Sequence, residues 1–584
     1  MDEAVVNSQQ KAKSLDVLFV NLPPYSPEPA NSKNETSGEN IMPPLGLLYL
    51  ANSIKDCSFV SSYKCADFGI AKLNGYSGEK HLAELVNKKL KETATNKPDV
   101  VAVSLMFSLA YPFFQIVIEE IRKCWKDTVI IVGGVHATNS AEYLLKNHPI
   151  DYITCGEGEE AFPSFLEMIA TGAEKNILGV HSLGNIKKTA DNQFEKTAAV
   201  ENFNIDYTRH PNLLDMEVYT KGITLFSLSK TDVSTRSFTI MASRGCPYLC
   251  TYCGGHTVHG RGSRWRDLKN VIDEIYWLNK NYGTIKYYLM DDVFVPKSKT
   301  LELLALLAKV DIEGFEIVLF NMSINATDSK IIDAIASVGI NTLTFAIESG
   351  SKVTQNKIKK WVNLDRAEEL CRYSQSKNLN VRAMYVIGFP GETISEMDET
   401  FRYAEKLGAD WSTFSVASPI PGTEVYNEFC ALGYIEDGPS SWAGDYTSFR
   451  DRVFDTKEIS KEDITELAYR ANLNVNFVNN INIKRRDFKN AETIFTNFVK
   501  MYDFHIFAYD CLRRIYKCTR DFEKESKTIK TMKMLIGSNV KSREFQKYFD
   551  LLDDEILGHL NDSFETGGGG VSTHPDESNL RLPV

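Results

Sequence analysis

One stretch decides how the chain is interpreted: Ser243-Arg244-Gly245-Cys246-Pro247-Tyr248-Leu249-Cys250-Thr251-Tyr252-Cys253. Its three cysteines have the spacing C-x-x-x-C-x-x-C and directly follow a strand-like run at 237–241. Thiolates this close on one loop can wrap a single soft metal centre, and cysteine thiolate is the usual ligand of iron–sulfur clusters. Three protein ligands leave one iron of a [4Fe–4S] cubane open to a substrate. We therefore predict that Cys246, Cys250 and Cys253 bind such a cluster.

Two other interpretations of these cysteines stay open at this point. They are three unrelated core cysteines, or part of a zinc site to which His256 and His259 contribute. Structural zinc sites usually have four ligands from paired motifs, and no second C-x-x-C follows. The sequence therefore favours the cluster.

The residues beside the cysteines add a family resemblance. Gly245 and Pro247 flank the first cysteine, and the aromatic Tyr252 precedes the third. In this the stretch resembles the radical S-adenosylmethionine (SAM) superfamily. The resemblance implies that the open iron chelates the amino and carboxylate groups of SAM, with Tyr252 at the position of the customary aromatic.

Length and composition set outer limits. The chain has 584 residues, more than one core usually holds, with 43% hydrophobic and 24% charged residues, as in soluble globular proteins. It lacks an apolar run of about 18 residues, and its first residues are polar, so we expect a cytoplasmic protein without a membrane span. Its eleven cysteines do not form a disulfide pattern, and the net charge of -11 argues against nucleic acid as a partner.

The N-terminal part alternates strand-like and helical segments. Such alternation predicts a doubly wound, Rossmann-like α/β domain with a parallel sheet, which binds ligands at the carboxyl ends of its strands. No G-x-G-x-x-G follows the first strand, so a dinucleotide site is weakly supported. The predicted strands are 16–22, 63–68, 99–104, 129–132 and 151–154.

Loops at the ends of these strands carry the second resemblance. Glycine pairs at strand ends can simply be tight turns, but four such loops upstream of the cysteine motif resemble the cobalamin-binding domain of cobalamin-dependent radical SAM enzymes, over residues 16–172. The cobalamin-binding residues that this resemblance implies are Pro44, Leu45, Gly46, Ser104, Gly133, Gly134, His136, Gly156, Glu157 and Gly158.

The chain departs from classical cobalamin proteins in one respect. The D-x-H-x-x-G signature, whose histidine binds cobalt, is absent. His136 stands in Gly133-Gly134-Val135-His136, a different context, and we expect it to line the cleft without a histidine–cobalt bond. The sequence leaves the lower ligand of cobalt undetermined.

The alternation of strand-like and helical segments restarts at residue 237. Six predicted strands fit the partial (β/α)6 barrel of the resembled superfamily, whose chemistry lies at the carboxyl ends of the strands. Polar groups stand at those ends, and each acidic one has helix capping as its alternative. The predicted strands are 238–241, 285–290, 315–320, 342–347, 381–387 and 411–416. The SAM-binding residues that the resemblance implies are Tyr252, Asp291, Asp292, Ser323, Glu348, Ser349 and Gly388.

Further candidates are less specific. Arg382 and Tyr385 are the candidate catalytic residues on the fifth strand, and Arg264 and Arg266 are either substrate contacts or solvated surface. We predict five regions: a cobalamin-binding domain at 1–175, a linker at 176–235, the barrel at 236–445, a helical domain at 446–565, and a disordered tail at 566–584.

The two resemblances together imply an enzyme. A 5′-deoxyadenosyl radical would abstract hydrogen from an unactivated carbon of a natural product, peptide or lipid, and methylcobalamin would supply the methyl group. A flavodoxin- or ferredoxin-like protein would donate the electron. Two alternatives stay open: a cobalamin-dependent rearrangement or cyclisation without methyl transfer, and a cobalamin or redox sensor with a structural cluster.

Overall fold

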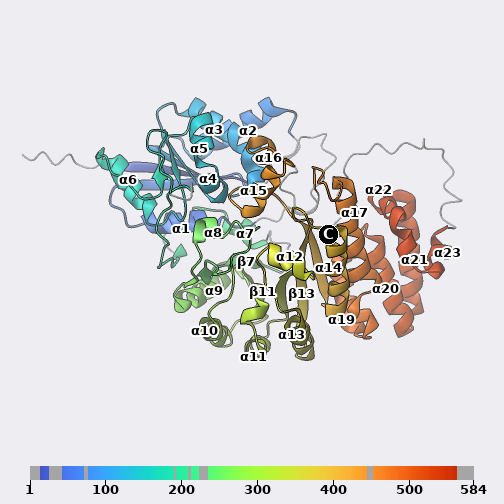
Figure 1. Ribbon diagram of the computed structural model, residues 1–584. Helices are drawn as coiled ribbons and strands as arrows, with labels where there is room; N and C mark the ends of the chain where they lie inside the picture. The colour runs from blue at the N-terminus through green and yellow to red at the C-terminus, as the bar shows by residue number, and fades with distance from the viewer. Residues whose placement is uncertain are drawn as a thin grey trace, which may run out of the picture.

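Two mainly parallel sheets and a bundle of helices make up the computed structural model (Figure 1). The structure describes residues 13–24, 42–71, 76–189, 193–207, 212–221, 235–442 and 452–561. The predicted tail at 566–584 lies outside the described residues. Within the described ranges, no helix combines the length and hydropathy that crossing a membrane requires.

The first sheet has the strand order β2-β1-β3-β4-β5-β6. All strands but β6 are parallel, and β1 is the switch point at which the strand order reverses. The short strand β6 lies in the predicted linker, so the sheet extends beyond the predicted boundary at 175. The strands are β1 (Leu15–Asn21), β2 (Val60–Asp67), β3 (Val100–Ser104), β4 (Val129–Gly133), β5 (Tyr152–Thr154) and β6 (Val180–His181).

Alternation along β1 explains why both faces of this sheet are covered. Val17 and Phe19 pack in one core with helices α1 and α6, whereas Leu18 and Val20 pack in another with α2 and α3. Successive strand residues point to opposite faces, so an almost continuous apolar strand needs helices on both sides. The doubly wound prediction is confirmed. The helices are α1 (Leu45–Ile54), α2 (Glu79–Thr93), α3 (Tyr111–Cys124), α4 (Val135–Asn139), α5 (Ala141–Asn147) and α6 (Ala161–Thr171).

The second sheet is the predicted partial barrel. Its order is β14-β13-β12-β11-β10-β7, each strand is parallel to its neighbours, and β7 and β14 are its two edges. The strands are β7 (Ser237–Ile240), β10 (Lys286–Leu289), β11 (Glu316–Met322), β12 (Thr342–Glu348), β13 (Asn380–Ile387) and β14 (Trp411–Val416). The helices outside it are α9 (Leu268–Tyr282), α10 (Lys297–Leu307), α11 (Ser329–Val338), α13 (Leu364–Ser376) and α14 (Ile394–Leu407).

The segment after β14 leaves the barrel. Helices α15 (Glu424–Ala431) and α16 (Pro439–Trp442) lie against the first domain (Figure 1). The Trp442 ring sits 5.0 Å from those of His136 and Tyr143 and 5.7 Å from that of Tyr111. The predicted barrel region at 236–445 therefore ends in elements that join the two domains.

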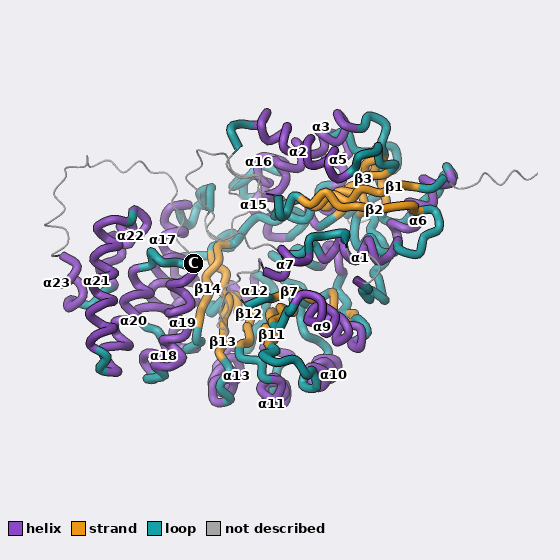
Figure 2. The backbone as a smooth tube through the Cα atoms, turned by 180° about the vertical axis from the view of Figure 1, so that it is seen from behind, coloured by secondary structure: helices purple, strands orange, loops and turns teal. Residues whose placement is uncertain are grey.

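The C-terminal helices cover the open edge of the barrel, as Figure 2 shows beside β14. The side-chain amide of Asn476 accepts from the Ser412 N–H and donates to the Ser412 carbonyl, both at 2.7 Å. An edge strand has unpaired backbone groups, and this asparagine satisfies two of them. The elements are α17 (Lys461–Leu473), the π-helical η5 (Asn474–Val478), α18 (Ile481–Lys484), α19 (Phe488–Met501), α20 (Ile506–Thr519), α21 (Phe522–Ser538), α22 (Val540–Arg543), the 3-10 helix η6 (Glu544–Leu551) and α23 (Asp554–Asn561).

Trp411 joins β14 to the C-terminal helices by apolar packing, and this packing can be tested. Its ring is 1% exposed and lies 5.5 Å from Phe477 and 5.4 Å from Phe498. Truncating a buried aromatic leaves a cavity that costs about 3–5 kcal/mol. We expect W411A to lower the urea midpoint of unfolding markedly, whereas W361A, at a side chain 57% exposed, leaves it nearly unchanged. Equal midpoints for the two variants would contradict this packing role.

Candidate active site between the two sheets

The cysteine loop is held in a short hairpin. Its first strand, β8 (Ser243–Arg244), pairs with β9 (Arg264–Trp265) in antiparallel fashion. Gly245 follows with φ +83°, and a Cβ there would lie 2.0 Å from the carbonyl oxygen of Gly262. Only glycine tolerates both the left-handed backbone and this close approach. The loop conformation therefore depends on the glycine just before Cys246.

The three cysteines lie near one another at the carboxyl edge of the barrel. Burial is the main reason that the pKa of Cys246 rises to about 11, and Cys253 and Cys250 raise it further. Thiols with raised pKa values release protons when they bind metal. Among the described residues, no three His, Cys, Asp or Glu side chains converge tightly enough for one metal ion. A cubane is wider than one ion, and three thiols on one loop are a donor set that fits it.

The two aspartates predicted to bind SAM hold this loop by its backbone. Asp291 is fully buried and accepts hydrogen bonds from the Ala242 and Ser243 N–H groups and from the Ser243 hydroxyl. Asp292 accepts from the Gly245 N–H at 2.7 Å. Burial raises the pKa of Asp291 to about 7, although the bonds from Ser243 and Ala242 oppose the rise. A contact of either carboxylate with SAM stays a prediction.

Two non-glycine residues with left-handed backbone lie at the ends of neighbouring strands. Asn321 has φ 60° and Glu348 has φ 68°. Such conformations cost free energy and concentrate at functional sites. The Asn321 amide donates to the Asp291 carbonyl at 3.0 Å, so one of them also supports the aspartate pair.

Glu348 faces a lysine that the sequence analysis did not identify. Lys360 Nζ lies 3.6 Å from Glu348 Oε1, and both side chains are largely buried. Burial would lower the pKa of Lys360, but Glu348 and the three cysteines raise it above its usual range. The ammonium group is thus next to both the carboxylate and the cysteine loop. No spacing rule links residue 360 to the motif, because the segment after β12, which includes helix α12 (Lys352–Lys357), brings it there.

The other predicted SAM-binding residues fall into two groups. The Tyr252 ring lies 5.6 Å from that of Phe389, beside Gly388, at an interplanar angle of 49°, and Ser323 shares a hydrogen bond of 2.8 Å with Tyr248. These residues border the cysteine loop. Ser349 is fully buried, and its hydroxyl is bonded to Thr400 and to the Ser351 N–H. That bonding does not favour the predicted contact of Ser349 with SAM.

The candidate catalytic residues of β13 lie apart from this edge. Tyr385 is fully buried on the helix-facing side, with its ring stacked 5.2 Å from that of Phe414. Arg382 is the third residue of the strand, five residues before its end, or roughly 17 Å at the usual rise. Its guanidinium donates to Thr413 at 3.1 Å. Neither position favours direct contact with a substrate at the carboxyl edge.

Arg452 of the C-terminal region contacts the loop after β13. Gly388 has φ +78°, and a Cβ there would lie 2.1 Å from Ile464 and 2.5 Å from the Arg452 guanidinium. Arg452 is buried and donates to the Gly388 carbonyl oxygen. This glycine is therefore required for close packing against the C-terminal region.

The predicted cobalamin-binding residues border the carboxyl edge of the first sheet. Gly134 has φ +111°, and a Cβ there would lie 2.5 Å from the Leu105 carbonyl oxygen. Gly156 and Gly158 would meet Thr197 and Leu50 at 2.5 Å and 2.7 Å, so packing within the protein explains these two glycines. Pro44, Leu45 and Gly46 begin α1, and Ser104 and Gly133 end β3 and β4 at this edge.

His136 is buried at this edge and has one free ring nitrogen. Its Nδ1 is bonded to the Ser108 hydroxyl at 2.8 Å, and its Nε2 has no hydrogen-bond partner. Burial lowers the pKa of His136 to about 3, so the imidazole is neutral. An orphaned buried nitrogen at a ligand-binding edge is suited to a polar group of a bound molecule.

The two carboxyl edges face each other. The Asn139 amide of α4 donates to the Thr257 hydroxyl of α8 (His256–His259) at 3.0 Å. Glu157 is bound by Arg264 and His259 of the barrel domain. Helix α7 (Met216–Lys221) lies at the carboxyl edge of the first sheet, where the Tyr219 hydroxyl donates to Asp67, the last residue of β2, at 2.7 Å. Any ligands of the two edges therefore share one interdomain space.

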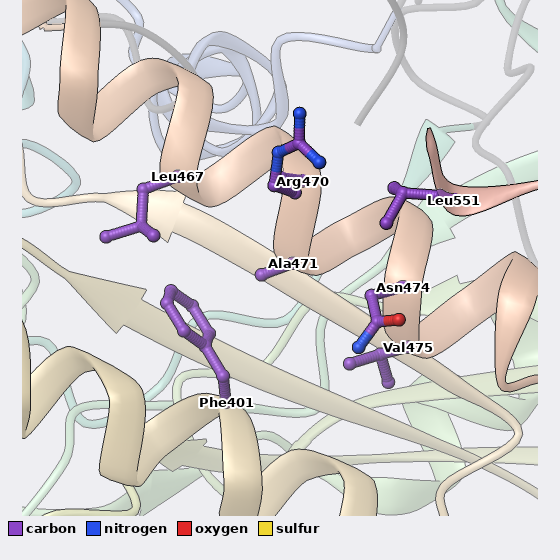
Figure 3. A pocket seen from close by; sticks show the side chains of 7 residues that line it. All are labelled: Phe401, Leu467, Arg470, Ala471, Asn474, Val475 and Leu551. Atoms are coloured by element: carbon purple, nitrogen blue, oxygen red, sulfur yellow. The ribbon is translucent and has the colours of Figure 1, made fainter. Parts of the chain in front are cut away.

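A separate hollow lies outside this space, at the seam between α14 and the C-terminal helices (Figure 3). It has a volume of about 290 Å³ and none of the predicted site residues among its lining. The lining is mainly apolar and comprises Phe401, Leu467, Arg470, Ala471, Asn474, Val475 and Leu551.

Comparison with known families finds one match in each of the two domains that carry these edges. Residues 36–166 match the B12 binding domain, and residues 240–404 match the radical SAM superfamily. The first match covers the loops of the first sheet from residue 36 onward, and the second contains the cysteine loop and the four barrel strands β10 to β13.

Similar curated proteins include methyltransferases and a cyclase. An uncharacterized methyltransferase of Pyrococcus horikoshii is 28% identical over 74% of this chain and 86% of its own length. The cytidylyl-2-hydroxyethylphosphonate methyltransferase of Streptomyces wedmorensis is 26% identical over 65% and 75%. The anaerobic magnesium-protoporphyrin IX monomethyl ester cyclase of Cereibacter sphaeroides is 23% identical over 66% and 60%.

Two solved structures share the fold. The radical SAM methyltransferase TsrM from Kitasatospora setae, solved with cobalamin and a [4Fe–4S] cluster, has a TM-score of 0.56 at 17% identity over 73% of this chain and 76% of its own. The cobalamin-dependent radical SAM enzyme OxsB, solved with aqua-cobalamin, has a TM-score of 0.53 at 13% identity over 94% and 83%.

Glu392, in the loop after β13, makes the apo-protein sensitive to pH. It is buried and accepts from the Gly388 and Phe389 N–H groups and from the Thr354 hydroxyl. Burial raises its pKa from 4.5 to about 7. Between these values the folded protein keeps a proton that the unfolded chain releases, so rising pH favours unfolding by on the order of 3 kcal/mol.

We expect the urea midpoint of the wild-type apo-protein to fall as pH rises from 5 to 7, and to level off above it. E392Q, which stays neutral, should show a flatter profile over this range. The exposed neighbour variant E399Q should keep the wild-type profile. An E392Q profile as steep as that of the wild type would disprove the assignment.

Proposed function

We propose that this chain, a cobalamin-dependent radical SAM methyltransferase, methylates an unactivated carbon of a small molecule or peptide in the space between its two sheets. The observation that carries the proposal is the Asn139–Thr257 contact, which joins α4 at the carboxyl edge of the B12-type sheet to α8, the helix that follows the cysteine loop. A methyl donor and a substrate radical must meet within bonding distance, so the two cofactors need one shared chamber.

The residues of this edge suggest how the cofactors would be held. Cys246, Cys250 and Cys253 would bind the cluster, while Asp291 and Asp292 fix the backbone that presents them. When bound, the cluster and SAM supply the radical, and the corrinoid supplies the methyl group. The chain itself contributes orientation and shielding.

Glu348 and Lys360 form a pair of opposite charges suited to the two charged groups of SAM. The Glu348 carboxylate would accept from the ammonium group, and the Lys360 ammonium would donate to the carboxylate. Their present separation of 3.6 Å means that each partially neutralises the other before SAM arrives. SAM would therefore replace one ion pair with two.

On the corrinoid side, the backbone of residues 44–46 and 133–134, the Ser104 hydroxyl and the free Nε2 of His136 would contact the corrin or its side-chain amides. Trp442 and Tyr219 flank this edge from two connecting segments, and such elements exclude water from a radical reaction. The lower face of cobalt stays without an assigned ligand.

Cyclisation and sensing are the two alternatives to methyl transfer. The Cereibacter sphaeroides relative is named a cyclase, which favours cyclisation without methyl transfer as the second possibility. A sensor with a structural cluster would need cobalamin and the cluster but no SAM site. The charged pair beside the cysteine loop supports SAM binding and so disfavours the sensor.

A product assay distinguishes the three functions. The chain is reconstituted anaerobically with iron, sulfide and cobalamin, reduced, and incubated with methyl-deuterated SAM and candidate metabolites. Methyl transfer predicts 5′-deoxyadenosine, S-adenosylhomocysteine and a deuterated product, with two SAM consumed per turnover. Cyclisation predicts an unlabelled product, and a sensor predicts no 5′-deoxyadenosine. C250A serves as the cluster-free control.

Substitution of Lys360 tests the SAM site separately. A hydrogen bond to a charged group contributes about 1.5–3 kcal/mol, so K360M should weaken SAM binding roughly 10- to 100-fold. Equilibrium dialysis of the reconstituted protein measures the affinity, and iron content should stay at the wild-type level. K359M is the matched control, because Lys359 pairs with Glu424 at the surface at 2.7 Å. Unchanged SAM affinity in K360M would exclude the proposed contact.

A further inference from the structure

Glu157 was predicted to bind the corrinoid, but its carboxylate is already saturated. Oε1 accepts from Arg264 Nη2 and His259 Nδ1, both at 2.7 Å. Oε2 accepts from Arg264 Nη1 at 2.8 Å and from the Val200 N–H at 2.7 Å. A carboxylate offers about four lone-pair sites, and all four are used. Glu157 therefore has no acceptor site left for a corrin amide.

The partners of Glu157 come from the barrel domain. Arg264 lies on β9 and His259 ends α8, so both flank the cysteine loop in the hairpin that carries it. The Arg264 guanidinium also donates to the His259 carbonyl at 2.9 Å. One carboxylate of the first domain thus ties together two points of that hairpin.

A second ion pair crosses the same boundary. Arg244, two residues before Cys246, pairs with Glu159 at 2.7 Å. Its guanidinium lies 4.5 Å from the ring of Tyr49 and 4.4 Å from that of Phe203. Arg244 is 3% exposed. It is therefore held on one side by charge and on the others by aromatic faces.

The two pairs form one buried network, the Glu157 network, made of Glu157, Glu159, Arg244, Arg264 and His259. Buried charges are tolerated only when they are paired, so moving the domains apart would leave several uncompensated charges. The network consequently resists even small changes in the spacing of the two loops. The Glu157 network also connects the predicted corrinoid loop, in which Glu157 is flanked by Gly156 and Gly158, to the cysteine motif.

We propose that Glu157 is a positioning residue that fixes the cysteine loop to the corrinoid-side loop and thereby sets the distance between cluster and cobalt. The inference rests on the proposed function, since it needs both cofactors. It assigns Glu157 no contact with either of them. Its effect is transmitted through Arg264 and His259.

Pulsed electron paramagnetic resonance on the holoprotein tests this distance. Reduced [4Fe–4S] cluster and cob(II)alamin each carry one unpaired electron, and their dipolar coupling reports the separation without any substrate. We expect one narrow distance distribution in the wild type and in E160Q, an exposed residue of the same loop. E157Q, which leaves Arg264 without its carboxylate, should broaden the distribution at least twofold while iron and cobalamin contents stay at wild-type levels.

The outcomes separate this inference from the proposed function. A wild-type protein that binds no cobalamin or no cluster refutes the proposed function. A loaded E157Q protein with the wild-type distance distribution refutes the role of Glu157. If E157Q does not hold both cofactors, E157D replaces it, because the shorter side chain keeps the charge but draws the hairpin toward the first domain. The same criterion then applies, and a shifted or broadened distribution supports the role.

Discussion

Everything at the interdomain site depends on carboxylates that hold one loop, by its backbone from one domain and by arginine side chains from the other. Asp291 and Asp292 bind the N–H groups of Ala242, Ser243 and Gly245 from the barrel side. From the other domain, Glu159 holds Arg244 and Glu157 holds Arg264. Within the loop, Tyr248 and Tyr252 contact Ser323 and Phe389, and the carboxylates add anchors from outside. The fold supplies them from two directions.

Local strain follows from the same requirement. Asn321 and Glu348 adopt left-handed backbone at the ends of β11 and β12. Neither residue type is free of cost in that region. Each conformation is over-determined by its surroundings: Asn321 by its bond to the Asp291 carbonyl, and Glu348 by its position above the Lys360 ammonium. At both positions the left-handed backbone accompanies a side-chain contact at the carboxyl edge of the barrel.

Sequence reasoning located the elements better than it oriented their side chains. Strand positions in both sheets were predictable, because apolar runs such as 16–22 and 342–347 mark strands buried on both faces. In such a strand the sequence does not show which face a side chain points to. Tyr385 and Arg382 lie three residues apart on β13 and therefore point to opposite faces of the sheet. Motif glycines were found, yet at Gly156, Gly158 and Gly388 packing within the protein explains them.

Long-range partners were the part that sequence could not supply. Lys360 and Arg452 stand at sequence positions that no periodicity relates to the site. Glu157 looked like a ligand-loop residue because its arginine partner stands 107 positions away. Spacing rules work within one element, where geometry fixes neighbours. They fail between elements, where the tertiary fold decides which charge meets which.

The C-terminal helices show why a partial barrel cannot be considered alone. An open sheet leaves β14 with unpaired backbone groups, and Asn476 and Trp411 join that edge to the helices by hydrogen bonds and by packing. The same region begins with Arg452, which bonds the Gly388 carbonyl at the carboxyl edge. Covering the edge and supporting the loop after β13 are therefore done by one continuous segment. A change in these helices would reach the site through the Gly388 loop, even though none of them contacts the cysteines in the described contacts.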